Sequence, residues 1–198
     1  IGECILFSEL FKDHAALLVT LAPKNPVERQ SYETWRSFCK QHAFYNVLFE
    51  VAHSIDFNVL VKGSDFCITT SVREGFGMTF MEPWLYDTPV VGRNIDYIVR
   101  DFDELGMRFP NNYSNLLVPG SELDFKAFSE EEQREIILDI LRNKERQAAF
   151  WSENPGIEQL FSEIEESLVH QNKEIIVNNY SFANYGKKLL ETYQDLFK

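Results

Sequence analysis

The sequence is poor in cysteine and in basic residues, and each shortage excludes a class of protein. The three cysteines, Cys4, Cys39 and Cys67, have no paired spacing, which predicts free thiols in a reducing compartment rather than a disulfide framework or a zinc site. The 19 lysines and arginines are outnumbered by 31 aspartates and glutamates, giving a net charge of −12. Because non-specific binding to nucleic acid requires a basic face, nucleic acid is not an expected partner.

Long apolar runs are also missing from the sequence. No run approaches the roughly 20 residues that a membrane-spanning helix needs, and no signal peptide is visible. We therefore expect a cytoplasmic protein, with a peripheral position at the inner face of the membrane as the alternative. The 44% hydrophobic and 25% charged residues are ordinary for a globular protein of 198 residues.

Short apolar runs alternate with helical patterns along residues 1–120. The runs typical of buried strands cover residues 15–21, 45–51, 65–70, 89–92 and 116–119. Helical patterns cover residues 3–13, 25–41, 56–63 and 78–86. This alternation predicts an α/β fold with a parallel sheet and right-handed crossovers. Residues 121–198 predict a helical extension packed on the same domain, with helices starting at Ser129 and covering residues 157–168, 174–178 and 182–197.

The strand expected at residues 65–70 runs into a glycine turn that opens the next helix. Gly75 and Gly77 let a ligand approach the backbone, and the first N–H groups of a helix suit a phosphate. Glu74 and Glu82 are suited to sugar hydroxyls, because a carboxylate repels phosphate. A phosphate at the glycines with a sugar on each side describes a nucleotide sugar. The alternative is that both glutamates are solvated surface charges and that the glycines only close a turn.

The motif Glu74-Gly75-Phe76-Gly77 with Glu82, followed by Thr88-Pro89-Val90-Val91-Gly92, resembles the C-terminal, donor-binding domain of GT-B glycosyltransferases. The likeness is greatest to the retaining family 4, and it covers nearly the whole chain, including the tail at residues 176–193. It implies a Rossmann-like parallel sheet flanked by helices. It also implies transfer of a sugar from a nucleoside diphosphate sugar (a UDP-, GDP- or ADP-sugar) to a hydroxyl of a glycan, lipid or small-molecule acceptor, without a metal ion.

The resemblance assigns roles to the residues of the turn. Glu74 would contact the hydroxyls of the donor sugar as the catalytic-site residue of this chain, and Glu82 would hold the ribose. The backbone groups that would bind sugar and phosphate oxygens belong to Gly75, Phe76, Gly77 and Met78.

The sequence departs from the family pattern in three ways. The first strand and its loop, which carries the Arg and Lys that neutralise the diphosphate, are expected to be missing, because Ile1 falls where the following helix would start. The N-terminal domain is expected to be missing too, so this part alone should bind donor weakly and catalyse nothing. Pro83 follows Glu82 and predicts a late or kinked helix. Asp87 replaces a usual glycine, at a left-handed C-cap that aspartate tolerates.

Other residues and other functions are also candidates. Arg73 is placed to reach phosphate or to pair with a neighbouring carboxylate, and Arg93 follows a strand near the expected cleft. His53 lies in the loop where the family places the base, although a satisfied loop residue is the simpler interpretation. Two rival functions are a non-catalytic nucleotide- or protein-binding module of the same fold, and a sugar phosphorylase or nucleotide-sugar epimerase of related architecture.

Overall fold

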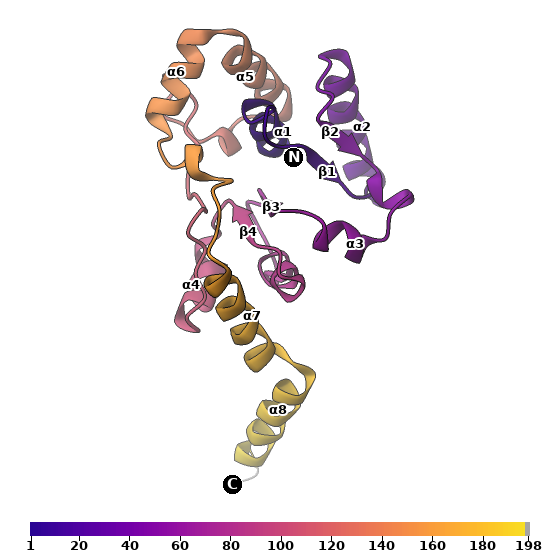
Figure 1. The fold of residues 1–198 in the computed structure, drawn as a ribbon, viewed down its shortest axis with the longest axis vertical. Helices are drawn as coiled ribbons and strands as arrows, with labels where there is room; N and C mark the ends of the chain where they lie inside the picture. Colours follow the sequence, from indigo (N-terminus) through magenta and orange to yellow (C-terminus); the bar gives the residue numbers. More distant parts are fainter. Residues whose placement is uncertain (197–198) are drawn as a thin grey trace.

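Two short parallel strand pairs and a larger set of helices make up the fold (Figure 1). The computed structural model describes residues 1–196, with positions 182, 185, 188 and 195 described by their backbone alone. Strand β1 (Leu17–Val19) pairs with β2 (Val47–Phe49), and β3 (Cys67–Thr69) pairs with β4 (Val90–Gly92), each in parallel register. All four strands lie within runs that the sequence predicts as strands, although each strand is shorter than its run.

The expected single parallel sheet is not formed, because no strand within residues 1–196 joins the two pairs. The structure shows a mixed α/β fold, mostly helical, with two small parallel sheets. The prediction of a strand at residues 116–119 is also wrong, since Leu117 makes only an isolated bridge to Asp124. The amide of Asn154 bonds both the N–H and the C=O of Leu117, at 2.7 and 3.0 Å, so a side chain takes the place of a neighbouring strand.

A glycine permits the pairing of β3 with β4 at its last position. Gly92, which is paired with Thr69, has a φ of +128°. A Cβ atom at this position would lie 2.0 Å from the carbonyl oxygen of Thr69. Only glycine therefore fits at the end of β4.

Local signals fix the ends of the helices in the first half of the chain. These helices are α1 (Gly2–Leu10), α2 (Pro26–Gln41), α3 (Phe57–Lys62) and α4 (Asp96–Glu104), with the 3-10 helices η1 (Val51–His53), η2 (Met78–Phe80) and η3 (Glu82–Tyr86). Helix α2 begins as predicted, because the side chain of Asn25 accepts the N–H of Val27 at 3.0 Å. Asp56 caps α3 in the same way through the N–H of Asn58.

The second half of the chain is helical apart from its connections. Its elements are η4 (Phe125–Ala127), α5 (Glu130–Arg142), α6 (Lys144–Glu153), η5 (Ile157–Gln159), α7 (Glu166–Tyr180) and α8 (Phe182–Leu196). The capping box predicted at Ser129 is confirmed, with Glu132 as its second member. The helices predicted over residues 174–178 and from Phe182 onward are confirmed as parts of α7 and α8. Residue 197, the last of that prediction, lies outside the described residues.

The apolar side chains form two cores. The first core joins α1, α2, α5 and α6 with both strand pairs, and the second joins η2, η3, α4 and α7. The helix predicted over residues 157–168 is wrong over most of its length, because η5 forms at its start, α7 begins only at Glu166, and residues 160–165 between them are not helical. In this connection Ile164 packs against both cores. This irregular connection, residues 160–165, carries the chain from one core to the other.

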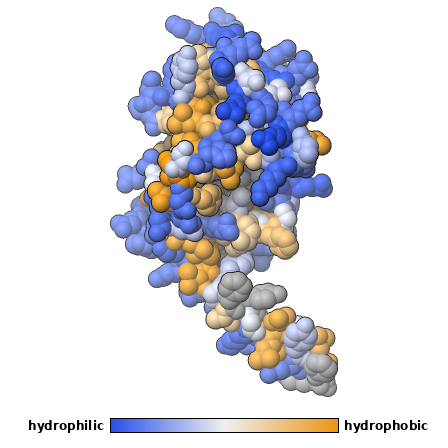
Figure 2. Space-filling view, turned by 90° about the vertical axis from the view of Figure 1, so that its right-hand side faces the viewer, coloured by the Kyte–Doolittle hydropathy of each residue, from blue (hydrophilic) through white to orange (hydrophobic). Residues whose placement is uncertain are grey.

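Helices α7 and α8 give the molecule its length. In Figure 1 they leave the body of the structure at its lower end, and Figure 2 shows α8 standing out from the rest of the surface. Among the residues that the structure describes, no helix is long and apolar enough to cross a membrane.

Candidate functional site

The turn at residues 71–77 follows β3 and leads into η2 and η3, instead of the single helix predicted over residues 78–86. Between the two short helices, Met81 has a φ of −112° and a ψ of −53°. Pro83 lies at the start of η3, where it has no N–H to continue a helical ladder. The kink expected from this proline is thus a complete break into two 3-10 helices.

This break changes which backbone N–H groups the turn presents to an anion. Met78 opens a helix of only three residues, so the expectation that a helix dipole points at the glycines is wrong. The first bond of η2 runs from the N–H of Phe80 to the C=O of Gly77 at 2.9 Å. The N–H groups of Met78 and Thr79 therefore make no hydrogen bond within η2. They are the backbone donors that the turn can offer to an anion, in place of the N-terminus of a long helix.

Glu74 is the most firmly placed residue of the turn. The hydroxyl of Tyr97, from α4, accepts the N–H of Glu74 at 3.0 Å and donates to its C=O at 2.7 Å. The hydroxyl of Thr79 donates to Oε1 of the Glu74 carboxylate at 3.2 Å. Glu74 itself is half-buried. Both backbone and carboxylate are held, while the second carboxylate oxygen has acceptor capacity for a ligand hydroxyl.

The two glycines of the turn have different roles. Gly77 has a φ of +68°, and a Cβ there would lie 2.6 Å from Cγ2 of Ile98 and 3.3 Å from the ring of Phe102. Gly77 is therefore required for packing against α4. A Cβ at Gly75 would meet nothing within 4 Å. Open space beside the backbone is thus a property of Gly75 rather than of both glycines.

The remaining residues predicted for this site lie at the surface. Phe76 has an exposed fraction of 87%, and Met78 one of 47%. Glu82 is exposed at the first position of η3. Within residues 1–196, the contacts recorded for Glu74 do not include Glu82. The structure thus joins Glu74 to Thr79 and Tyr97, two residues that the sequence analysis did not single out.

Arg93 does not face a ligand site. Its guanidinium has an exposed fraction of 1% and pairs with two carboxylates, Glu3 at 2.5 Å and Asp124 at 2.8 Å. The hydroxyl of Tyr113 also donates to Glu3. Burial acts to raise the pKa of Asp124, but the hydrogen bonds from Arg93 outweigh it and the pKa is lowered. The proposal that Arg93 touches substrate is wrong, since its donors serve an ion cluster that fixes α1.

The other candidates lie at the surface or take part in local structure. His53 lies at the end of η1 rather than in a loop; its side chain is exposed and lies 3.8 Å from the carboxylate of Glu50. Arg73 is exposed beside Glu74. Asp87 has a φ of +62° at the end of η3, which confirms its expected left-handed position. Its carboxylate pairs with Lys173 of α7 at 2.7 Å.

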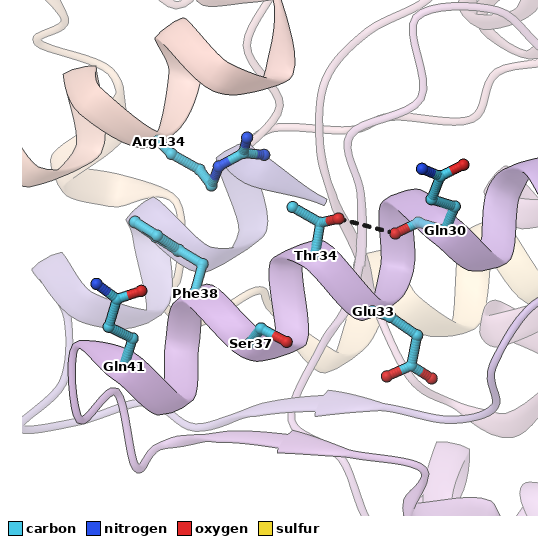
Figure 3. A pocket seen from close by; sticks show the side chains of 7 residues that line it. All are labelled: Gln30, Glu33, Thr34, Ser37, Phe38, Gln41 and Arg134. Carbon is cyan, nitrogen blue, oxygen red and sulfur yellow. Dashed lines mark hydrogen bonds between the residues drawn. The ribbon is translucent and has the colours of Figure 1, made fainter.

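A separate groove lies between α2 and α5 (Figure 3). Its volume is about 450 Å³, and its lining residues are Gln30, Glu33, Thr34, Ser37, Phe38, Gln41 and Arg134. The guanidinium of Arg134 lies over the ring of Trp35 at 5.3 Å. The groove shares no residue with the glycine turn, and its mixed amides, hydroxyls and single cation do not select one ligand chemistry.

The comparisons with known proteins do not assign the chain to a family. No protein-family model, no curated protein and no solved structure matched it. Within residues 1–196, no three His, Cys, Asp or Glu side chains lie together in a way that would hold a metal ion. The residues around Glu74 therefore supply the chemistry from which a function is inferred.

Proposed function

We propose that the chain is the donor-binding part of a retaining glycosyltransferase, which moves a sugar from a nucleoside diphosphate sugar to an acceptor hydroxyl. In this proposal Glu74 accepts hydrogen bonds from hydroxyls of the donor sugar. The backbone at residues 75–78 contacts sugar and phosphate oxygens, and Glu82 accepts from the ribose. The acceptor is a glycan, a lipid or a small molecule, and an N-terminal domain supplies its site. The enzyme works in the cytoplasm or at the inner face of the membrane.

The fixed position of Glu74 is the observation that carries this proposal. Its backbone is held at both polar groups by Tyr97, and its carboxylate is oriented by Thr79. A carboxylate that is held in place before the ligand arrives loses little freedom on binding, which favours recognition of a sugar hydroxyl. Two of the three bonds fix the backbone of the turn, and the bond from Thr79 orients the carboxylate itself.

The position of the turn in the fold supports the same function. It follows the carboxyl end of β3, whose neighbour β4 runs parallel to it. In open parallel sheets, ligands bind beyond the carboxyl ends of the strands. The finer form of this proposal is a Rossmann-like parallel sheet that contains both strand pairs, which the described residues show as two separate sheets. The open space beside Gly75 then lies where a donor would meet the backbone.

Binding of nucleotide sugars tests the proposal directly. The protein is mixed in turn with UDP-, GDP- and ADP-sugars, and the shift in its unfolding temperature is measured for the wild type, Glu74→Gln and Glu82→Gln. We expect one donor class to raise the unfolding temperature of the wild type, and both substitutions to reduce that shift. Glu135→Gln, at an exposed glutamate of α5, is the matched control and keeps the full shift.

Two outcomes would contradict the proposal in different ways. A shift that both Glu74→Gln and Glu82→Gln leave intact would place the nucleotide elsewhere on the protein. Binding of the bare nucleoside diphosphate as tightly as of every sugar derivative would favour the non-catalytic nucleotide-binding module. A phosphorylase is recognised instead by release of a sugar 1-phosphate when inorganic phosphate is added, and an epimerase by sugar inversion without an acceptor.

A further inference from the structure

Residue types alone do not select a ligand for the groove between α2 and α5, but the pairing of its charged groups does. Arg134 of α5 is directed toward α2 across this groove (Figure 3). Its Nη1 is buried without a hydrogen-bond partner, and within residues 1–196 its guanidinium pairs with no carboxylate. Acidic residues outnumber basic ones by 31 to 19, so this cation does not lack a partner because carboxylates are scarce.

The carboxylates that line the groove are engaged elsewhere. Glu33 lies 4.0 Å from the guanidinium of its own-helix neighbour Arg36. Glu130 accepts a hydrogen bond from the hydroxyl of Ser31 at 2.5 Å, which joins α5 to α2 beside the groove. Arg134 therefore keeps its hydrogen-bond donors although two acidic residues line the same groove. A half-buried cation without an internal partner is best satisfied by an anion from outside the chain.

The orientation of Arg134 and the charges around it favour a carboxylate as this anion. The guanidinium lies 5.3 Å from the ring centre of Trp35, which is fully buried and gives it a fixed base. A guanidinium held in this way presents a planar fork of N–H groups that matches the two oxygens of a carboxylate. A phosphate carries nearly two negative charges, so Glu33 and Glu130 repel it more strongly than a carboxylate.

The shape of the groove suits an extended peptide. Two adjoining hollows share Gln30, Thr34 and Arg134, so together they form one groove that follows α2 from Val27 to Gln41. These 14 residues of helix correspond to about 21 Å. All lining residues belong to α2 and α5, which leaves the solvent side open, whereas a small-molecule pocket encloses most of its ligand. An extended peptide of about six residues has the length of the groove.

The side chains along α2 complement such a peptide. The amides of Gln30 and Gln41 both donate and accept hydrogen bonds, as the peptide groups of a ligand do. The hydroxyl of Thr34 donates to the C=O of Gln30 at 2.9 Å, so its oxygen is left as an acceptor. At one end of the groove the apolar side chain of Val27 is 78% exposed. It precedes Thr34 by seven residues, about 10 Å along the helix, which is the reach of three residues of extended peptide.

We propose that the groove between α2 and α5 binds an extended segment of a partner protein that carries an aspartate or glutamate at its centre. The carboxylate accepts hydrogen bonds from Arg134, and the backbone of the segment pairs with the amides of Gln30 and Gln41. An apolar side chain three residues from the carboxylate packs on Val27. The groove shares no residue with the turn at residues 71–77, so binding of this segment is measured independently of donor binding.

Peptide titration followed by NMR tests this proposal. The probe is the peptide Leu-Ser-Ser-Asp-Ser-Ser-Leu, capped at both ends, in which a leucine stands three residues from the aspartate in either chain direction. We expect saturable shifts of the Nε–H of Arg134 and of the backbone amides of Gln30 and Gln41. The same peptide with asparagine in place of aspartate should bind about tenfold more weakly, because it loses the charge-assisted hydrogen bonds.

Two substitutions of the same charge separate the role of Arg134 from a general effect of charge. Arg134→Gln should remove the difference between the two peptides, whereas Arg100→Gln, at an exposed arginine of α4, should keep it. Arg134→Lys keeps the charge but not the planar fork, and should weaken binding of the aspartate peptide several-fold. If Arg134→Gln does not fold, as judged from its NMR spectrum, the comparison is made with Arg134→Lys alone.

Four results would overturn the proposal. Equal affinity for the aspartate and asparagine peptides would exclude the carboxylate, and binding that survives the Arg134 substitutions would place the peptide elsewhere. If capped aspartate alone bound as tightly as the whole peptide, the site would be one for a free carboxylic acid. The absence of saturable shifts at about 5 mM peptide, where even a weak complex forms, would show that the groove binds no such segment.

Discussion

The hydroxyl of Tyr97 is bonded to both backbone polar groups of Glu74, at 3.0 Å from the N and 2.7 Å from the O. Tyr97 comes from the start of α4, 23 residues further along the chain. A side chain of α4 thus fixes the backbone of the turn that carries the proposed sugar-binding carboxylate. We therefore expect loss of this hydroxyl to affect donor binding more than folding.

Tyr97→Phe should weaken donor binding by about tenfold, because the Glu74 carboxylate loses its fixed position. The cost in stability should be only about 0.5–1.5 kcal/mol, since Tyr97 is 46% exposed and its bonds compete with water. Titration calorimetry and urea unfolding measure the two effects. The control is Tyr86→Phe, which removes a hydroxyl bonded to Asn58 at 2.7 Å. Equal loss of donor affinity in both variants would remove Tyr97 from its positioning role.

Gly77→Ala and Gly75→Ala should separate folding from binding. Gly77→Ala should cost about 1–3 kcal/mol in the free energy of unfolding, because it puts a Cβ against Ile98 and keeps a positive φ. Gly75→Ala should change stability by less than about 0.5 kcal/mol, since its Cβ meets nothing. It should nevertheless reduce donor binding if the ligand lies against that backbone. Urea unfolding and the thermal-shift assay give the two values, and a destabilised Gly75→Ala protein would show that the turn packs differently.

Arg93→Met should be among the most destabilising single changes in the protein. It leaves the buried carboxylate of Glu3 without its cation and removes the shorter of the two ion pairs of the half-buried Asp124, which costs about 3–5 kcal/mol. Arg146→Met is the matched control, because its pair with Asp139 is short, at 2.6 Å, but largely exposed, and should cost less than about 1 kcal/mol. Urea unfolding compares the two. A small effect of Arg93→Met would mean that the carboxylates take up protons or water at little cost.

Acid should release part of this ion cluster. The pKa of Asp124 in the folded state is lowered from its ordinary value of 3.8, so its contribution to stability is present above that value and is lost as the pH falls through the lower folded pKa. Asp124→Asn should therefore remove part of the loss in stability that the wild type shows between about pH 5 and pH 2. Urea unfolding across this range measures it, and parallel curves for the two proteins would contradict the assignment.

The sequence predicts those parts of the fold that depend on neighbours in the chain. Asn25, Asp56 and Ser129 start helices because each bonds an N–H two or three residues away. The four strand positions are also predicted, since continuous apolar runs indicate burial. The break after Met81 is predicted only in part, because Pro83 indicates a kink but not its extent.

Contacts between distant residues explain what sequence reasoning missed. Arg93 lies 90 residues from Glu3 and 31 from Asp124, and no spacing in the sequence indicates that they meet. Tyr97 has no motif that would connect it with Glu74. The division of the strands into two pairs is likewise not predictable from the sequence of any one strand, because it depends on which strand edges pair with each other. At the candidate site, sequence patterns identify the carboxylate and the glycines but not the side chains that orient them.

Gly92 has a consequence for how this protein can evolve. Any side chain there would collide with the main chain of Thr69, so a descendant cannot replace this glycine and keep the two strands together. A lineage that carries another residue at the equivalent position must have changed its strand arrangement first. The identity of this one residue, read across related genomes, therefore reports whether the ancestral architecture has been inherited.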